Sequence, residues 1–228
     1  MFIGHYGPAI WVAQRARGVR LWHAFLAVQA IDLVSFSFSL FGLEGDQKPD
    51  GSHPMALDIA WSHSLLSAVI ISFIVAFIYR GLKPQAGWKA VIIMGCLAFS
   101  HWPLDWLVHR PDLPFYPGGE LMMGQGLWDY PWLTFFAEVI LFWGMILWWL
   151  SVTRGKLWTL VTVLLLSVAL TYLHFDVVTH PTLQFHHDGT VAPARTRFEL
   201  IAGLVIFIGS AAIIAFVERN RCVKSDHP

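Results

Sequence analysis

Charged residues are scarce in this chain. Only 13% of its 228 residues are Asp, Glu, Lys or Arg, against about 25% in an average globular protein. The formal net charge is zero, so nothing in the composition favours nucleic acid as a partner. Its two cysteines, Cys96 and Cys222, lie far apart in unlike surroundings, which excludes a disulfide framework and any zinc-finger spacing.

Apolar residues are abundant instead, at 56% of the chain, and they form long runs. A helix needs about 20 consecutive apolar residues to cross a bilayer core. Six runs meet or approach that length: 20–42, 60–80, 88–110, 132–153, 157–176 and 199–218. A shorter seventh run, 2–16, is expected to be a short or tilted helix at the edge of the bundle. We therefore predict one all-α integral membrane domain, 1–228, with six to seven transmembrane helices.

The basic residues predict the orientation of these helices. Connections that carry an excess of Lys and Arg stay in the cytoplasm. Eleven of the fifteen basic residues lie on alternate connections, which places the C-terminus in the cytoplasm and, with seven crossings, the N-terminus outside. The eleven are Arg15, Arg17, Arg20, Arg80, Lys83, Lys89, Arg154, Lys156, Arg219, Arg221 and Lys224.

One motif stands out within the spans, at His101, Asp105 and His109. The i, i+4, i+8 spacing stacks the three side chains along one helix face. A carboxylate between two imidazoles suits Zn²⁺ or a pair of metal ions, because an aspartate can bridge them. Interhelical hydrogen bonds explain the same pattern equally well. Pro103, inside the motif, predicts a kink.

Other spans place ionisable residues at a similar depth, in the outer half of the bilayer. These are His5 in the first run, Asp32 in the second and His63 at the start of the third. Ionisable groups within a membrane are costly and mark functional sites by default. Taken singly, each has a structural explanation, as a helix cap, an interfacial anchor or an interhelical hydrogen-bonding group.

The segments Ser62–Leu66 (SHSLL), Ser100–His109 (SHWPLDWLVH) and 109–119 (HRPDLPFYPGG) together resemble the YdjM-type family. Its members are bacterial inner-membrane proteins described as metal-dependent hydrolases. The resemblance covers roughly residues 1–152, and 153–228 supply additional transmembrane helices without a recognised motif.

The YdjM-type family in turn resembles zinc-dependent phospholipase C and the P1-type nucleases. By position, that resemblance implies His5, Asp32, His63, His101 and Asp105 as zinc ligands, with two ions or more. In the soluble enzymes the next ligand histidine lies further beyond the aspartate than His109 does. His109 therefore stays a candidate ligand on its spacing alone.

This chemistry predicts a hydrolase. Metal ions held by His and Asp generate hydroxide from water near neutral pH and clamp the oxygens of a phosphoester. Asp105 is expected to bridge the metals and to be catalytic. Arg110 is expected either to bind the substrate phosphate through its guanidinium or to extend its charged end to the membrane interface at the end of a span. The Pro/Gly-rich segment 111–131 is expected either to cap a lipid entrance or to form an ordinary membrane-hugging loop.

Two further features have no assigned chemistry. Glu138 stands alone in an apolar span and is expected to support or extend the ligand set. The outer stretch 174–188, rich in His and Asp, either holds another metal or titrates in solvent.

The predicted function is therefore cleavage of a phosphoester of a lipid or lipid-linked substrate, at the outer leaflet of the bacterial inner membrane. A metal-ion transporter would spread its ionisable residues from one face to the other, whereas here the inner halves of the spans carry few charges. A di-iron membrane oxidase would need clustered histidines on the cytoplasmic side. A non-catalytic protein with a structural metal also remains open.

Overall fold

The computed structural model describes residues 1–16, 18–45, 59–179 and 196–223. Over these residues the protein is an all-α bundle, as predicted, with two short two-stranded antiparallel sheets. The helices are η1 (Ile3–His5, a 3-10 helix), α1 (Tyr6–Ala13), α2 (Leu21–Val28), α3 (Ala30–Leu40), α4 (Ala60–His63), α5 (Leu65–Leu82), α6 (Trp88–Phe99), α7 (His101–Val108), η2 (Leu127–Asp129, 3-10), α8 (Pro131–Val152), α9 (Leu157–Thr179) and α10 (Arg197–Glu218).

The long helices are those of a multi-pass membrane protein. Among the described residues, α5, the continuous stretch α6–α7, α8, α9 and α10 are long and apolar enough to cross a bilayer. The pair α2–α3 adds a sixth crossing if its two halves form one span. Large apolar side chains such as Phe73, Phe77 and Ile140 are more than 60% exposed. Such a surface fits contact with lipid rather than with water.

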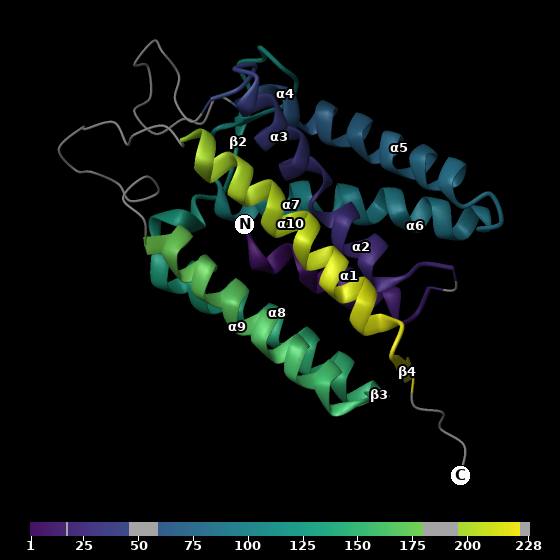
Figure 1. Cartoon of the computed structure of the whole chain (residues 1–228). Coiled ribbons are helices and arrows are strands. Elements are labelled where there is room, and N and C mark those ends of the chain that lie inside the picture. Colours follow the sequence, from purple (N-terminus) through teal and green to yellow (C-terminus); the bar gives the residue numbers. More distant parts are fainter. Residues whose placement is uncertain (17, 46–58, 180–195, 224–228) are drawn as a thin grey trace.

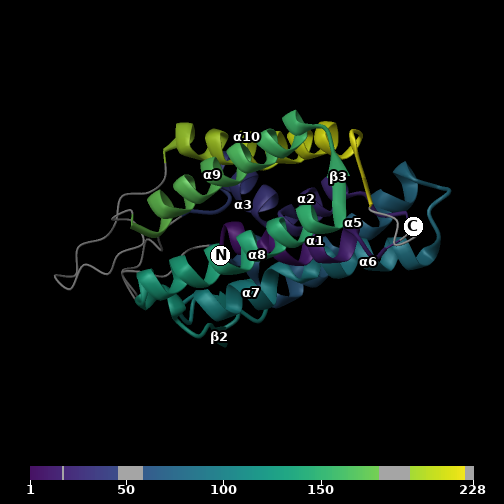
Figure 2. The same ribbon diagram turned by 90° about the horizontal axis from the view of Figure 1, so that it is seen from below.

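The first segment lies elsewhere than expected. The sequence predicted residues 2–16 at the edge of the bundle, but Ile3, Tyr6 and Ile10 are fully buried. In Figures 1 and 2, η1 and α1 lie in the middle of the bundle, beside α2 and α8. A Cβ at Gly7 would come 3.0 Å from Leu141 Cγ, so glycine permits this close approach to α8. The segment is short, and it is not among the helices that could span a membrane.

Two of the expected spans are interrupted near the same depth. The pair α2–α3 bends by 50° at Gln29. The stretch α6–α7 is broken at Ser100, three residues before Pro103. A proline ring clashes with the carbonyl four residues earlier, which here belongs to Phe99, the last residue of α6. The break therefore lies where Pro103 predicted an irregularity, and it starts α7 at His101.

The interior of the bundle is built from aromatic and aliphatic side chains of α1, α2 and α8. Tyr6 stacks on Phe25 with ring centroids 4.4 Å apart, and it also contacts Phe142. Trp149 and Ile146 extend this core along α8. The rigid centre fixes the positions of η1 and α2, both of which lead to the polar cluster described below.

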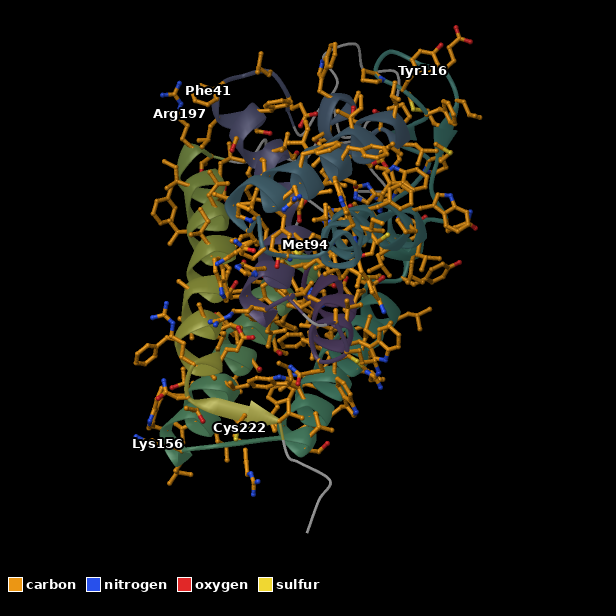
Figure 3. All side chains as sticks on the ribbon, turned by 90° about the vertical axis from the view of Figure 1, so that its right-hand side faces the viewer. Phe41, Met94, Tyr116, Lys156, Arg197 and Cys222 are labelled. Carbon is orange, nitrogen blue, oxygen red and sulfur yellow. The ribbon has the colours of Figure 1, made fainter. Side chains whose placement is uncertain are left out.

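The two ends of the bundle differ in their residues. The antiparallel pair of β3 (Thr153–Gly155) and β4 (Arg221–Val223) joins the α8–α9 turn to the segment after α10. Figure 3 shows Lys156 at this end, opposite Phe41 and Arg197. Most of the basic connections identified in the sequence fall at the same end as β3 and β4 (Figure 1).

Candidate metal centre

Five side chains from separate parts of the chain meet at one buried point. His101 Nε2 lies 2.9 Å from Asp105 Oδ2 and 3.6 Å from Asp32 Oδ1. His5 Nε2 is 3.2 Å from Asp105 Oδ1. His63 Nε2 lies 3.4 Å from Asp32 Oδ1 and 3.5 Å from Asp105 Oδ2. The structure thus brings together all five ligands that the family resemblance implied.

The donor atoms form two overlapping groups of three. His5, His101 and Asp105 make one triad, and Asp32, His63 and His101 make the other, each with its ligand atoms within 4.8 Å of one another. Catalytic zinc sites use three protein ligands of these types and keep a further position for water or substrate. The donor set therefore fits two neighbouring zinc ions: Asp105 has one oxygen near His5 and the other near His63, so it could serve both, whereas His101, with one free ring nitrogen, could bind only one.

The ends of α2 and α4 orient the histidine side chains of the cluster. The last carbonyls of a helix lack partners within it, and the Val28 carbonyl, at the end of α2, accepts a hydrogen bond of 2.6 Å from His101 Nδ1. Because a carbonyl only accepts, Nδ1 carries the proton and Nε2 presents its lone pair to the cluster. At Ser64 the backbone turns extended and the hydroxyl caps α5, which sets His63 at a corner.

Several nitrogen atoms of the cluster lack a hydrogen bond. Nε2 of both His5 and His101 is buried without a hydrogen-bond partner, although Asp105 oxygens lie close. Burial is the largest cause that lowers the pKa of His5, to about 3, so its imidazole is neutral near pH 7. An unpaired buried polar atom costs about 1–3 kcal/mol, and a bound cation removes this cost for both rings.

Two carboxylates, Asp32 and Asp105, lie within this pocket of imidazoles. Asp105 Oδ1 also lies 2.5 Å from the Met1 nitrogen. No lysine or arginine lines the adjoining cavity among the residues that the structure describes. Buried charges are stable only when paired or coordinated to a metal, so the centre favours a divalent cation.

The two remaining predicted site residues stand apart from both triads. His109 Nδ1 lies 3.0 Å from Asp112 Oδ1, and its ring centroid is 4.0 Å from that of Trp128. Arg110 Nε donates a hydrogen bond of 2.5 Å to Asp129 Oδ1, and Arg110 does not line the cavity. The structure therefore places His109 at the rim of the site and Arg110 in the loop beyond it.

Glu138 is hydrogen-bonded to the segment that carries His5. Its Oε2 accepts hydrogen bonds from the backbone N–H groups of Phe2 (2.8 Å) and Gly4 (3.0 Å), and these residues flank the start of η1, which carries His5. His174, fully buried, has its Nδ1 3.9 Å from the same oxygen. Glu138 belongs to neither triad, so it acts on the centre through the backbone.

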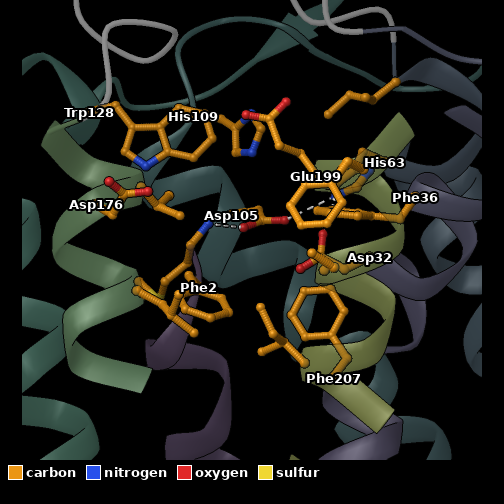
Figure 4. A pocket seen from close by; sticks show the side chains of 18 residues that line it. Phe2, Asp32, Phe36, His63, Asp105, His109, Trp128, Asp176, Glu199 and Phe207 are labelled. Carbon is orange, nitrogen blue, oxygen red and sulfur yellow. Dashed lines mark hydrogen bonds and ion pairs between the residues drawn. The ribbon is translucent and has the colours of Figure 1, made fainter. Parts of the chain in front are cut away.

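A cavity of about 430 Å³ opens beside the cluster, within the roughly 300–1,000 Å³ typical of ligand pockets. Figure 4 shows Asp32, His63 and Asp105 on its wall, with Phe36, Phe207 and Glu199 nearby. Most of the other lining side chains are apolar, and many come from α9 and α10: Leu173, Val177, Phe198, Ala202, Gly203 and Ile206.

The loop after α7 closes one side of this cavity. It contains the hairpin of β1 (Leu113–Pro114) and β2 (Met122–Met123), and the N–H of Gly126 donates to the His109 carbonyl. Trp128, in η2, lines the cavity beside His109. The segment 111–131 thus folds back on the end of α7 and contributes Trp128 to the cavity wall.

Some contributors were not predicted from the sequence. The last two spans carry no motif, yet α9 and α10 supply the apolar cavity wall. Of the stretch 174–188, His174 is buried and Asp176 lines the cavity, whereas 180–188 lie outside the described residues. Glu44, buried next to Ser62, follows an exposed glycine-containing turn and gave no signal of a role.

Comparison with known proteins adds no assignment: no protein-family model, curated protein or solved structure matches this chain.

Proposed function

We propose that this protein is a metal-dependent hydrolase, with zinc as the metal, that cleaves a phosphoester of a membrane lipid or lipid-linked substrate. One observation carries the proposal: a largely apolar cavity ends on the two His/Asp triads. Such a cavity accommodates a hydrocarbon chain, while the triads offer the ligands of a hydrolytic metal site. The resemblance to the YdjM-type family agrees with this chemistry.

In this proposal, His5, His101 and Asp105 would hold one ion, and Asp32 and His63 would hold a second together with Asp105. Zinc bound there lowers the pKa of a coordinated water towards about 7 and stabilises charge on phosphate oxygens. The chain itself orients the substrate through the apolar wall of α9 and α10. His109, hydrogen-bonded to Asp112 at the cavity rim, is placed to exchange protons with the substrate.

The proposed location is the bacterial inner membrane, with the C-terminus cytoplasmic and the cavity towards the periplasm. The cavity is bordered by Phe198, at the start of α10, and Arg197 lies at the end of the bundle opposite Lys156. Val177 of α9 and Phe198 of α10 line the cavity and are also exposed at the surface of the described residues. A lipid entering there would come from the outer leaflet, with its phosphate leading towards the cluster.

Hydrolysis by purified protein tests the proposal. The wild type is incubated in mixed micelles with phospholipids of differing headgroup, with and without a chelator, and phosphate-containing products are measured. Asp105→Asn is the site variant, and Glu120→Gln, at an exposed carboxylate in the loop, is the matched control. We expect turnover that the chelator and Asp105→Asn abolish but Glu120→Gln does not.

Folded wild type without chelator-sensitive turnover on any phosphoester contradicts the proposal. In that event, zinc uptake into proteoliposomes would favour the transporter alternative, and bound metal with neither activity would favour a structural role.

A further inference from the structure

Glu44 is a buried carboxylate outside both triads. It follows α3 and is only 6% exposed. Both of its oxygens accept hydrogen bonds from Ser62: the backbone N–H donates to Oε1 at 2.6 Å and the hydroxyl to Oε2 at 2.8 Å. A carboxylate held by two donors in this way is fixed in place, and so is the serine next to His63.

The direction of these bonds decides which nitrogen of His63 carries its proton. A serine hydroxyl has one hydrogen, and an ionised carboxylate can only accept. The Ser62 hydroxyl therefore donates to Glu44 and accepts from His63 Nδ1, which lies 2.7 Å away. The His63 imidazole therefore carries its proton on Nδ1. Its Nε2, which has the lone pair, faces Asp32 Oδ1 at 3.4 Å and Asp105 Oδ2 at 3.5 Å.

His101 and His63 are oriented by different kinds of hydrogen-bond partner. The proton of His101 is held by a backbone carbonyl, that of Val28, which no side-chain substitution removes. The proton of His63 depends on the side chains of Ser62 and Glu44. The indole Nε1–H of Trp102 donates to the His63 carbonyl at 2.9 Å and steadies the backbone, but it does not select the tautomer.

We propose that Glu44 is a positioning residue for one metal ion: through Ser62 it holds His63 as a ligand beside Asp32. The metal centre it serves is that of the proposed function. Hydrogen-bonding partners of metal-ligating histidines typically change metal affinity by about 10- to 100-fold. The effect of Glu44 is confined to the triad of His63, because the triad of His5 and Asp105 does not depend on that tautomer.

Glu44→Gln is the sharpest variant, because it keeps the shape of the side chain. Its amide oxygen can accept from the Ser62 N–H, which leaves an NH₂ donor facing the Ser62 hydroxyl. The hydroxyl then donates to His63 Nδ1 at 2.7 Å, a closer acceptor than the Ile59 carbonyl at 3.3 Å, so the ring proton moves to Nε2 and the lone pair is lost from the cluster. Ser62→Ala removes the relay, whereas Ser62→Thr retains a hydroxyl. Glu120→Gln, in an exposed loop, is the matched control.

The test is a titration of metal-free protein in detergent with Co²⁺, followed by its visible absorption, and with Zn²⁺ in competition with a chelating dye. For Glu44→Gln we expect one of two sites to weaken about 10- to 100-fold and the other to keep its affinity. Ser62→Ala should behave like Glu44→Gln, Ser62→Thr should restore most of the affinity, and Glu120→Gln should match the wild type.

Equal weakening of both sites, or unchanged binding by Glu44→Gln, overturns the positioning role, as does failure of Ser62→Thr to exceed Ser62→Ala. A wild type that binds no divalent cation overturns it together with the proposed function. A wild type that binds two ions but cleaves no phosphoester contradicts only the proposed function, so the two failures are distinguishable.

Discussion

The imidazole rings of His5 and His101 stack almost parallel, with their centroids 3.6 Å apart and 8° between their planes. His5 comes from the buried first segment and His101 from the break in the α6–α7 stretch. Each ring therefore limits the orientation of the other, and the contact joins the start of the chain to the helix that supplies Asp105. The side chains of the cluster therefore position one another, and we expect the loss of one of them to change the orientation of those it contacts.

Metal removal should destabilise the protein. A cation that binds only the folded state, at about 100 times its dissociation constant, contributes about 2.7 kcal/mol of stability. We expect a chelator to lower the unfolding temperature of the wild type in detergent and to leave that of Asp105→Asn nearly unchanged. An equal shift in both proteins would show that the chelator acts elsewhere.

His109→Gln should separate metal binding from turnover. His109 belongs to neither triad, so the metal content per chain should equal that of the wild type. If the imidazole exchanges protons with the substrate, turnover should fall by about 10²–10⁴-fold. Metal analysis and hydrolysis rates on the same preparation check both parts. Loss of metal in this variant would instead make His109 a ligand.

Gly203→Ala should narrow the cavity. A Cβ at Gly203 would lie 2.2 Å from Phe36 Cε1, so the ring, which lines the cavity, must move. Gly209, on the same helix, has nothing within 4 Å of such an atom and serves as the control. We expect Gly203→Ala to raise KM several-fold for a long-chain phospholipid but not for a small water-soluble phosphodiester.

Gly209→Ala should be neutral, or more stable by about 0.5–1 kcal/mol, because alanine favours the helix. Equal KM values for the long-chain lipid in both alanine variants would place the hydrocarbon chain outside this cavity.

Glu138→Ala should loosen the segment that carries His5. The variant leaves the N–H groups of Phe2 and Gly4 buried without an acceptor, at about 1–3 kcal/mol each. We expect a lower unfolding temperature and weaker binding of the ion held by His5, with Glu138→Gln much closer to the wild type because its carbonyl oxygen still accepts. Thermal unfolding and Zn²⁺ titration check this. Indistinguishable Ala and Gln variants would exclude the acceptor role.

The sequence predicted the helices well, because runs of apolar residues report length and burial directly. It also indicated the residues of the cluster, since ionisable side chains at one depth in separate spans are rare in membranes. The i, i+4 spacing of His101 and Asp105 places both in the cluster, and Pro103 marked the nearby break. These signals are local, or depend only on counting residues along a span.

Other features depend on contacts between distant segments, which no local pattern encodes. The first segment is as apolar as an edge helix would be, and only its packing against α2 and α8 places it at the centre. The role of Glu44 depends on the return of the chain to Ser62. The spacing of His109 suits a ligand, but the helix ends at Val108 and His109 becomes extended, which turns its ring to Asp112 instead.

Metal content measured on purified protein tests the central claim most directly: the buried His/Asp cluster holds two ions that share Asp105. Mass spectrometry of the metals should find about two zinc ions per chain in the wild type, about one in His5→Ala and His63→Ala, and none in Asp105→Ala. His23→Ala, a buried histidine outside the cluster, should retain both ions. Equal metal content in wild type and Asp105→Ala, or none in either, would contradict the account.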